Sequence, residues 1–149
     1  VTSSSCLPYS ACNLGFPPQK IRKIFGAAKM YDTRVGKDPD FPDDLFCNQE
    51  LLTIAKEGHE YGTTTNRPRL VNYLNLDKLI TAVKISGTTD LIISKVDILE
   101  KTNIFRYYYQ DNLHSALSIE DMKRIIENIL YNCSSLLKNI TFSSNPEQI

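Results

Sequence analysis

The chain has 149 residues and a hydrophobic content of 42%, which is enough for one domain with a real core. Lys and Arg total 17 and so do Asp and Glu, so no net field favours nucleic acid or an anionic membrane. No apolar run approaches the roughly 20 residues of a membrane span, and the start "VTSSSCLPYS" lacks the features of a signal peptide, so we expect a cytoplasmic protein.

Three helices are predicted in the first part of the chain, over residues 17–31, 48–58 and 75–87. In each, apolar side chains recur at the spacing of one helix face. The second and third helices end at glycines that suit a helix C-terminus, Gly58 and Gly87. The apolar positions of the first two helices are Ile21, Ile24, Phe25, Ala28, Leu51, Leu52 and Ile54.

The second part of the chain mixes strands with one long helix. Residues 90–99 and 103–109 read as strands, the first without alternation, as expected of a strand that is covered on both faces. A long amphipathic helix follows from Ser118, with its apolar stripe running to Leu136, and "NITFS" at residues 139–143 closes the chain as a strand. This order predicts an α/β fold with a mostly parallel sheet and flanking helices.

The cysteines and histidines do not form a metal-binding pattern. Cys6, Cys12, Cys47 and Cys133 show neither CxxC pairs nor the spacing of a zinc site. With only His59 and His114 beside them, we expect reduced thiols, a structural loop histidine at 59 and a surface histidine at 114.

The stretch "EYGTTTNRPRL", residues 60–70, concentrates hydroxyl groups and two arginines in one loop. Arginine offers a planar fork that matches carboxylate or phosphate oxygens, and threonine hydroxyls can complete a polar cage around such an anion. Gly62 and Asn66 tolerate the positive φ that a tight bend requires. The loop therefore suits a small dianion, although a solvated loop whose arginines meet nearby carboxylates fits the composition equally well.

A second signal is "SKVD" at residues 94–97. Lys95 and Asp97 leave the end of a predicted strand and resemble the guanine-reading element of GTP-binding proteins. There a carboxylate accepts hydrogen bonds from guanine N1–H and the exocyclic amine, a donor pair that adenine lacks. Alone the motif is weak, because a lysine and an aspartate often follow a strand.

Taken together, these stretches carry a resemblance. "VTSS" at 1–4, "GAAKMYDTRVG" at 26–36, "GHEYGTTTNRPR" at 58–69 and "ISKVDIL" at 93–99 resemble adenylosuccinate synthetase, in the same order and at nearly the family's spacing. The tail "KNITFSSNPEQI" is similar to the family's last nucleotide-contacting turn. The chain, which starts at a valine, thus resembles the C-terminal part of a P-loop-NTPase-like enzyme without its N-terminal catalytic half.

The resemblance implies a GTP-dependent ligase of AMP biosynthesis. In that family GTP phosphorylates the C6 oxygen of IMP, and the amine of L-aspartate then displaces phosphate to give adenylosuccinate. The family also implies a homodimer and Mg²⁺, with the metal held mainly by the missing N-terminal half. Neither catalytic residues nor metal ligands are expected in this chain, and alone it is expected to be inactive.

The same likeness assigns binding roles to individual residues. The aspartate loop comprises Thr63, Thr64, Thr65, Asn66 and Arg67. The IMP-binding residues are Thr2, Val35 and Arg67. The GTP-binding residues are Arg69, Lys95, Val96, Asp97, Ser143, Ser144 and Asn145.

Three departures from the family pattern leave alternatives open. Asn66 stands where the family usually has glycine, "SSNP" replaces "STGP", and "CLPYSACNLGFPP" lacks the usual glycine-rich segment near the IMP phosphate. The first alternative is a phage-type enzyme that makes 2-amino-2'-deoxyadenylosuccinate from dGMP. The second is a nucleotide-binding remnant without catalysis. Neither nucleic acid nor membrane is expected as a partner.

Overall fold

The computed structural model describes residues 7–36, 38–39, 41, 45, 47–62 and 66–145. Within these ranges, no helix combines the length and the apolar character that crossing a membrane requires. In chain order the elements are α1 (Leu7–Asn13), the 3-10 turn η2 (Pro18–Lys20), β1 (Phe25–Lys29), β2 (Tyr31–Arg34), α2 (Gln49–Glu57), β3 (Leu70–Asn75), α3 (Leu76–Ser86), β4 (Asp90–Ser94), α4 (Val96–Thr102), β5 (Arg106–Tyr109), β6 (Asn112–Ser115), α5 (Ile119–Cys133) and β7 (Asn139–Phe142).

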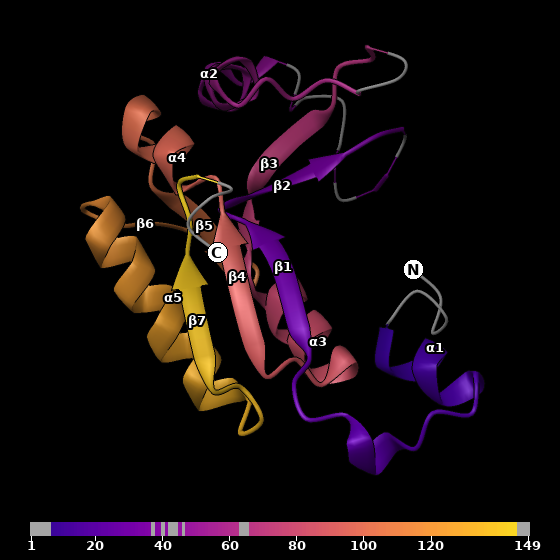
Figure 1. Cartoon of the computed structure of the whole chain (residues 1–149). Helices are drawn as coiled ribbons and strands as arrows, with labels where there is room; N and C mark the ends of the chain where they lie inside the picture. The colour runs from indigo at the N-terminus through magenta and orange to yellow at the C-terminus, as the bar shows by residue number, and fades with distance from the viewer. Residues whose placement is uncertain are drawn as a thin grey trace.

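The strands form two sheets. One has the order β1-β4-β7 and is parallel throughout, so that the three arrows in Figure 1 point the same way, toward α2. The other has the order β2-β3-β5-β6, with β3 and β5 parallel and the outer pairs antiparallel. The predicted α/β class with a parallel sheet is confirmed, whereas the second, mixed sheet was not predicted.

A single residue, Met30, joins the two sheets. Lys29 ends β1 and Tyr31 begins β2, so only one residue separates the two strands. Met30 is fully buried, and its backbone N–H donates to the Ser94 carbonyl at 2.9 Å, which extends the β1–β4 pairing by one step. Because of this link, the carboxyl end of the parallel sheet lies against the start of the second sheet.

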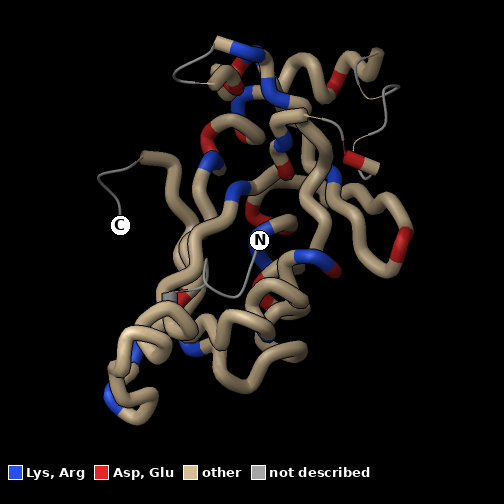
Figure 2. The backbone as a smooth tube through the Cα atoms, turned by 90° about the vertical axis from the view of Figure 1, so that its right-hand side faces the viewer, with Lys and Arg blue, Asp and Glu red and all other residues tan. Residues whose placement is uncertain are grey.

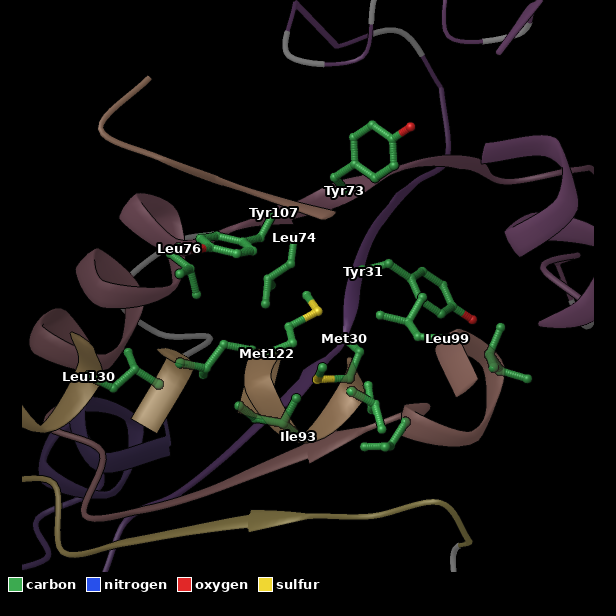
Figure 3. Close-up of a cluster of buried hydrophobic side chains, with 14 of the residues drawn as sticks. Met30, Tyr31, Tyr73, Leu74, Leu76, Ile93, Leu99, Tyr107, Met122 and Leu130 are labelled. Carbon is green, nitrogen blue, oxygen red and sulfur yellow. The ribbon is translucent and has the colours of Figure 1, made fainter. Parts of the chain in front are cut away.

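The core occupies the space between the sheets and around α3 and α5. In Figure 3 the side chains of Ile93 (β4), Met122 (α5) and Leu74 (β3) lie close to that of Met30, which comes from the junction between β1 and β2. The fully or nearly fully buried residues of this cluster also include Tyr31, Leu51, Ile54, Leu76, Val96, Leu99, Ile126 and Leu130. One continuous apolar cluster thus holds both sheets.

Three predicted helices are confirmed by their caps. The Asn48 side chain accepts hydrogen bonds from the backbone of Glu50 and Leu51 at the start of α2. Asn75 does the same for α3, and Ser118 for α5, so the first orphan N–H groups of all three helices are satisfied. Gly87 ends α3 with a φ of 67°, the left-handed conformation expected of a C-terminal glycine.

The helix predicted over 17–31 is wrong. That segment contains η2, a connection, β1 and the first residue of β2. The helix-like spacing of its apolar residues is overridden by pairing with β4, where Gly26 pairs with Leu91. A Cβ at Gly26 would come within 2.9 Å of the side chain of Thr88, just before β4, and within 3.2 Å of that of Leu91. The strand therefore forms because small residues let it approach its neighbour, which periodicity alone does not reveal.

The strand predicted over 90–99 is only half right. β4 ends at Ser94, Lys95 turns in the left-handed region with φ 68°, and α4 begins at Val96. The run looked continuous because the buried residues of β4 and of α4 follow one another directly. The strands predicted near 103–109 and at 139–143 are confirmed as β5 and β7 with shorter bounds.

The long helix predicted from Ser118 is confirmed, but it is shorter than its apolar pattern suggests. α5 ends at Cys133, and Leu136, predicted on the buried stripe, lies beyond the helix with 56% of its surface exposed. Within α5, Leu130 near the C-terminal end is fully buried.

Gly58 is required by a close contact, not by its backbone conformation. Its φ of −74° is open to any residue, but a Cβ there would collide with the Tyr31 hydroxyl and come within 3.0 Å of the Ile54 carbonyl. Tyr31 is fully buried and its hydroxyl is bonded to Glu60, so it cannot move aside freely.

We therefore expect Gly58→Ala to destabilise the protein by about 1–3 kcal/mol through overpacking. Urea unfolding of the variant measures this loss. Tyr31→Phe removes the hydroxyl that causes the collision, so it should be less destabilising in the Gly58→Ala background than in the wild type. An equal loss in both backgrounds would contradict the steric explanation.

Candidate functional site

The candidate site lies at the carboxyl edge of the parallel sheet. Lys29 ends β1, Lys95 follows β4 and Ser143 follows β7, so the three strands bring residues of distant sequence to one edge. In Figure 1 this edge faces α2 and the top of the molecule. Ligands of open α/β sheets bind at the carboxyl ends of the strands.

The Lys95 turn connects β4 to α4 and carries the predicted guanine-reading pair. Because Lys95 adopts a left-handed conformation, the chain changes direction and α4 begins at Val96. Asp97 then lies in the first turn of α4, where the helix dipole favours a carboxylate. The Asp97 side chain is 30% exposed, with Lys101 one turn away at 3.8 Å. The Lys95 ammonium donates to the Gly58 carbonyl at 3.2 Å, which ties this turn to the loop that follows α2.

The Ser143 turn packs directly beside the Lys95 turn. The Ser143 N–H donates to the Ile93 carbonyl at 2.9 Å, and its own carbonyl accepts from the Val96 N–H at 3.4 Å. Ser143 is buried and its hydroxyl donates to the Asn145 carbonyl at 2.7 Å. The structure thus brings the two predicted guanine-contacting stretches together, with Ser144 and Asn145 exposed at the surface.

The arginine loop is closed at its base as a hairpin. Tyr61 bridges Pro68, the Gly62 N–H donates to the Arg67 carbonyl at 2.8 Å, and the Arg69 N–H donates to the Glu60 carbonyl at 2.9 Å. Asn66 has a φ of 48°, as predicted for a tight bend. The predicted ligand-binding threonines Thr63, Thr64 and Thr65 lie outside the described residues.

The two arginines of the loop differ in their surroundings. The Arg69 guanidinium forms an ion pair with the Glu60 carboxylate at 3.3 Å. The solvated-loop alternative expected such a contact between a loop arginine and a nearby carboxylate. Arg67 is exposed, and among the described residues no ion pair or side-chain hydrogen bond holds its guanidinium. Of the two arginines, Arg67 is therefore the one whose guanidinium has no partner among the described residues.

Glu60 is the central group that sequence reasoning missed. It is only 3% exposed, and its carboxylate accepts from the Lys29 ammonium at 2.8 and 2.9 Å, from the Tyr31 hydroxyl at 2.7 Å and from Arg69. Burial opposes the charged carboxylate, but the hydrogen bonds from Lys29 and Tyr31 outweigh it, so the pKa of Glu60 lies below its ordinary value. Glu60 is therefore an anion at neutral pH.

Tyr31 supports this carboxylate as a permanent donor. Burial raises the pKa of the Tyr31 hydroxyl far above its ordinary value, and the hydrogen bond to Glu60 adds to the shift. The hydroxyl therefore keeps its proton throughout the physiological range. The only sequence signal for this cluster is an acidic residue beside the arginine loop, which says nothing about burial.

Charges of both signs surround the site. Figure 2 shows basic and acidic positions interspersed through the upper half of the molecule rather than gathered into a patch of one sign. Within the described ranges, no three His, Cys, Asp or Glu side chains come close enough to hold a metal ion. The site thus carries charges of both signs, with Glu60 bonded to both Lys29 and Arg69.

The remaining predicted positions that the structure describes are not part of the Glu60 cluster. Thr2 falls outside the described residues. Val35, 56% exposed, follows β2, whose last residue Arg34 pairs with Leu70 next to Arg69. His59 and His114 are both exposed, His59 in the loop with a φ of 50° and His114 stacked on Tyr107.

Known proteins resemble this chain along most of its length. Residues 1–132 match the family model for adenylosuccinate synthetase. Adenylosuccinate synthetase of Petrotoga mobilis is 40% identical over 111 residues, which cover 72% of this chain and 26% of that protein. The enzyme of that name from Thermotoga maritima is 37% identical over 132 residues, covering 85% of this chain and 32% of that protein.

The fold is also found in a solved structure. Fully ligated adenylosuccinate synthetase from Plasmodium falciparum matches 93% of this chain and 41% of its own with a TM-score of 0.68, at 19% sequence identity. The chain spans about a quarter to a third of the two curated relatives described above. The extent of these matches shows that the chain belongs to the adenylosuccinate synthetase family.

Proposed function

We propose that the protein containing this chain ligates L-aspartate to IMP with GTP as co-substrate and forms adenylosuccinate. The observation that carries this proposal is the meeting of three stretches at one sheet edge. The Lys95 ammonium donates to the Gly58 carbonyl, two residues before the arginine loop, and the Val96 N–H donates to the Ser143 carbonyl, so the Lys95 turn, the Ser143 turn and the segment that leads into the loop are in contact. Family membership supports the reaction that these segments serve.

The Lys95 turn suits recognition of guanine. Asp97 would accept hydrogen bonds from guanine N1–H and the exocyclic amine, and the Lys95 stem would pack along the base. The exposed Ser144 and Asn145 would close over the base from the β7 side. Because adenine lacks the donor pair, its binding would leave the carboxylate unpaired, and this would favour GTP over ATP.

The arginine loop suits recognition of L-aspartate and IMP. Arg67 is exposed and unpaired among the described residues, so its guanidinium is available for a carboxylate of aspartate and for the IMP site. Thr63, Thr64, Thr65 and Asn66 would complete the aspartate loop, with Thr2 and Val35 at the nucleotide. Holding the amine beside the activated C6 of IMP would contribute proximity, which lowers a barrier by several kcal/mol, on the order of 7–11 in favourable systems.

The chain supplies binding groups and not the whole reaction. GTP phosphorylates the C6 oxygen of IMP, and the aspartate amine then displaces phosphate. By the likeness to the family, Mg²⁺ would be held mainly by segments outside this chain. We further propose a cytoplasmic homodimer, and a 149-residue chain that does not catalyse the reaction alone.

The test is a reconstitution assay with the full-length protein. IMP, L-aspartate and GTP together should give adenylosuccinate, and omission of any one of them should abolish it. Replacing IMP by dGMP tests for the phage-type reaction, and replacing GTP by ATP tests base selectivity. Product from dGMP alone would contradict the proposal, and GTP binding without product from either nucleotide would indicate a non-catalytic remnant.

Asp97→Asn should raise the KM for GTP by about 5- to 150-fold, because one of the two guanine donors then faces an amide instead of a carboxylate. Xanthosine triphosphate has an oxygen at C2 that can accept from the new amide, so it should lose less. Steady-state kinetics with each nucleotide measure both effects. Glu100→Gln is the control, since Glu100 lies exposed on the same helix with Lys123 at 4.0 Å. An unchanged KM for GTP in Asp97→Asn would remove Asp97 from the base site.

Arg67→Lys should raise the KM for L-aspartate by about tenfold and leave the KM for GTP nearly unchanged, because one ammonium cannot reproduce two parallel N–H bonds. A fall in kcat would show that the contact tightens in the transition state. Arg124→Lys, an exposed arginine of α5 paired with Asp121, is the matched control. If Arg67→Lys and the control behave alike, the loop is a solvated surface loop.

A further inference from the structure

The Glu60 carboxylate is saturated by protein donors. Oε1 accepts from Lys29 and from the Tyr31 hydroxyl, and Oε2 accepts from Lys29 and from Arg69. A carboxylate offers about four lone-pair sites, and four hydrogen bonds occupy them. Glu60 therefore has no capacity left for a ligand, and its function must be exerted through the groups that it holds.

Arg69 is the partner with capacity to spare. Its backbone N–H donates to the Glu60 carbonyl at 2.9 Å and one guanidinium nitrogen donates to the Glu60 carboxylate at 3.3 Å. A guanidinium carries five N–H donors, so most of them are not used by this pair. Its Nε is buried and has no hydrogen-bond partner among the described residues, while the side chain as a whole is 31% exposed.

The geometry gives Arg69 a fixed direction. Glu60 and Arg69 stand at the two ends of the hairpin stem, and their backbone and side-chain bonds link the same two residues twice. The guanidinium is thereby held at the edge that also carries Lys95, which reaches the Gly58 carbonyl two residues before Glu60. The Arg69 side chain also lines a small pocket with Leu51 and Ala55 of α2, while 31% of it stays exposed.

Charge explains why the holding group must be an anion. Lys29 and Arg69 both bond to the same carboxylate, so two cations stand close together in a half-buried place. The negative charge between them offsets their mutual repulsion and their loss of hydration. A neutral group of the same shape would leave the arginine free to turn toward water.

We propose that Glu60 is a positioning residue that aims the Arg69 guanidinium at the polyphosphate of GTP. This rests on the proposed function, which assigns Arg69 to the GTP site. Glu60 itself does not touch the nucleotide. An arginine held in place by a carboxylate loses less freedom when it binds an anion, so the gain appears in nucleotide affinity.

The experiment is a double-mutant cycle on GTP binding in the full-length protein, with calorimetric Kd and the KM for GTP measured for wild type, Glu60→Gln, Arg69→Gln and the double variant. Each single substitution should weaken GTP by about tenfold or more. The double variant should be no more than about twofold weaker than Arg69→Gln, because Glu60 has nothing to aim once the arginine is gone. Glu100→Gln is the control and should leave binding unchanged.

A merely structural role gives a different pattern. If Glu60 only holds the fold together, the losses in the double variant multiply, and that outcome overturns the proposal. Glu60→Asp serves if Glu60→Gln does not fold: it keeps the charge beside Lys29 but is one methylene too short to hold both partners, so it should also weaken GTP. A folded Glu60→Asp with wild-type GTP affinity overturns the proposal as well.

Failure of the proposed function gives a separate result. If the wild type binds GTP and the cycle is non-additive but no adenylosuccinate forms, the positioning role stands and the reaction is wrong. If adenylosuccinate forms and the cycle is additive, the reaction stands and the positioning role is wrong. A wild type that does not bind GTP overturns both.

Discussion

A buried negative charge has to be compensated where it stands, and in this protein that requirement falls on Glu60. Its partners come from the end of β1, the start of β2 and the residue before β3, so one carboxylate joins three strands of two sheets to the loop after α2. Removing any one partner would leave the charge under-compensated in a place with little water. The arrangement of the loop relative to the sheets therefore follows from a local electrostatic need.

The same need explains two features that otherwise look unrelated. Tyr31 must keep its hydroxyl directed at Glu60, and this leaves no room for a side chain at position 58, so glycine is found there at an ordinary φ. Lys95 in turn uses the Gly58 carbonyl as its anchor. Charge compensation, a steric restriction and the placement of the Lys95 turn thus form one chain of contacts.

The helices could be predicted from sequence because their signals are local. Asn48, Asn75 and Ser118 cap their helices with their own side chains, and a stripe of apolar residues follows each of them. β1 could not be predicted, because it depends on how closely Gly26 approaches Thr88, a residue 62 positions away by the numbering of the sequence. β2 and β3 were missed because they pair with each other and with β5, and not within a hairpin that a turn sequence would reveal.

The site divides in the same way. Lys95, Asp97 and the arginine loop carry recognisable residue types at short spacing, and in the structure the Lys95 turn contacts both the Ser143 turn and Gly58, which leads into the loop. Glu60 and Lys29 were missed because nothing in their neighbours along the chain tells whether a charged side chain is buried. That property is set by Tyr31 and by the second sheet, which themselves were not predicted.

The one-residue junction at Met30 has a mechanical consequence. β1 and β2 belong to different sheets, yet only Met30 separates them. Met30 is held by the hydrogen bond from its N–H to the Ser94 carbonyl and by its fully buried side chain. A one-residue junction held in this way leaves the two sheets little freedom to shift relative to each other. Sliding one sheet past the other by even one residue would break this bond and pull Met30 out of the core, so a displacement at the carboxyl edge of the parallel sheet is transmitted directly to the second sheet.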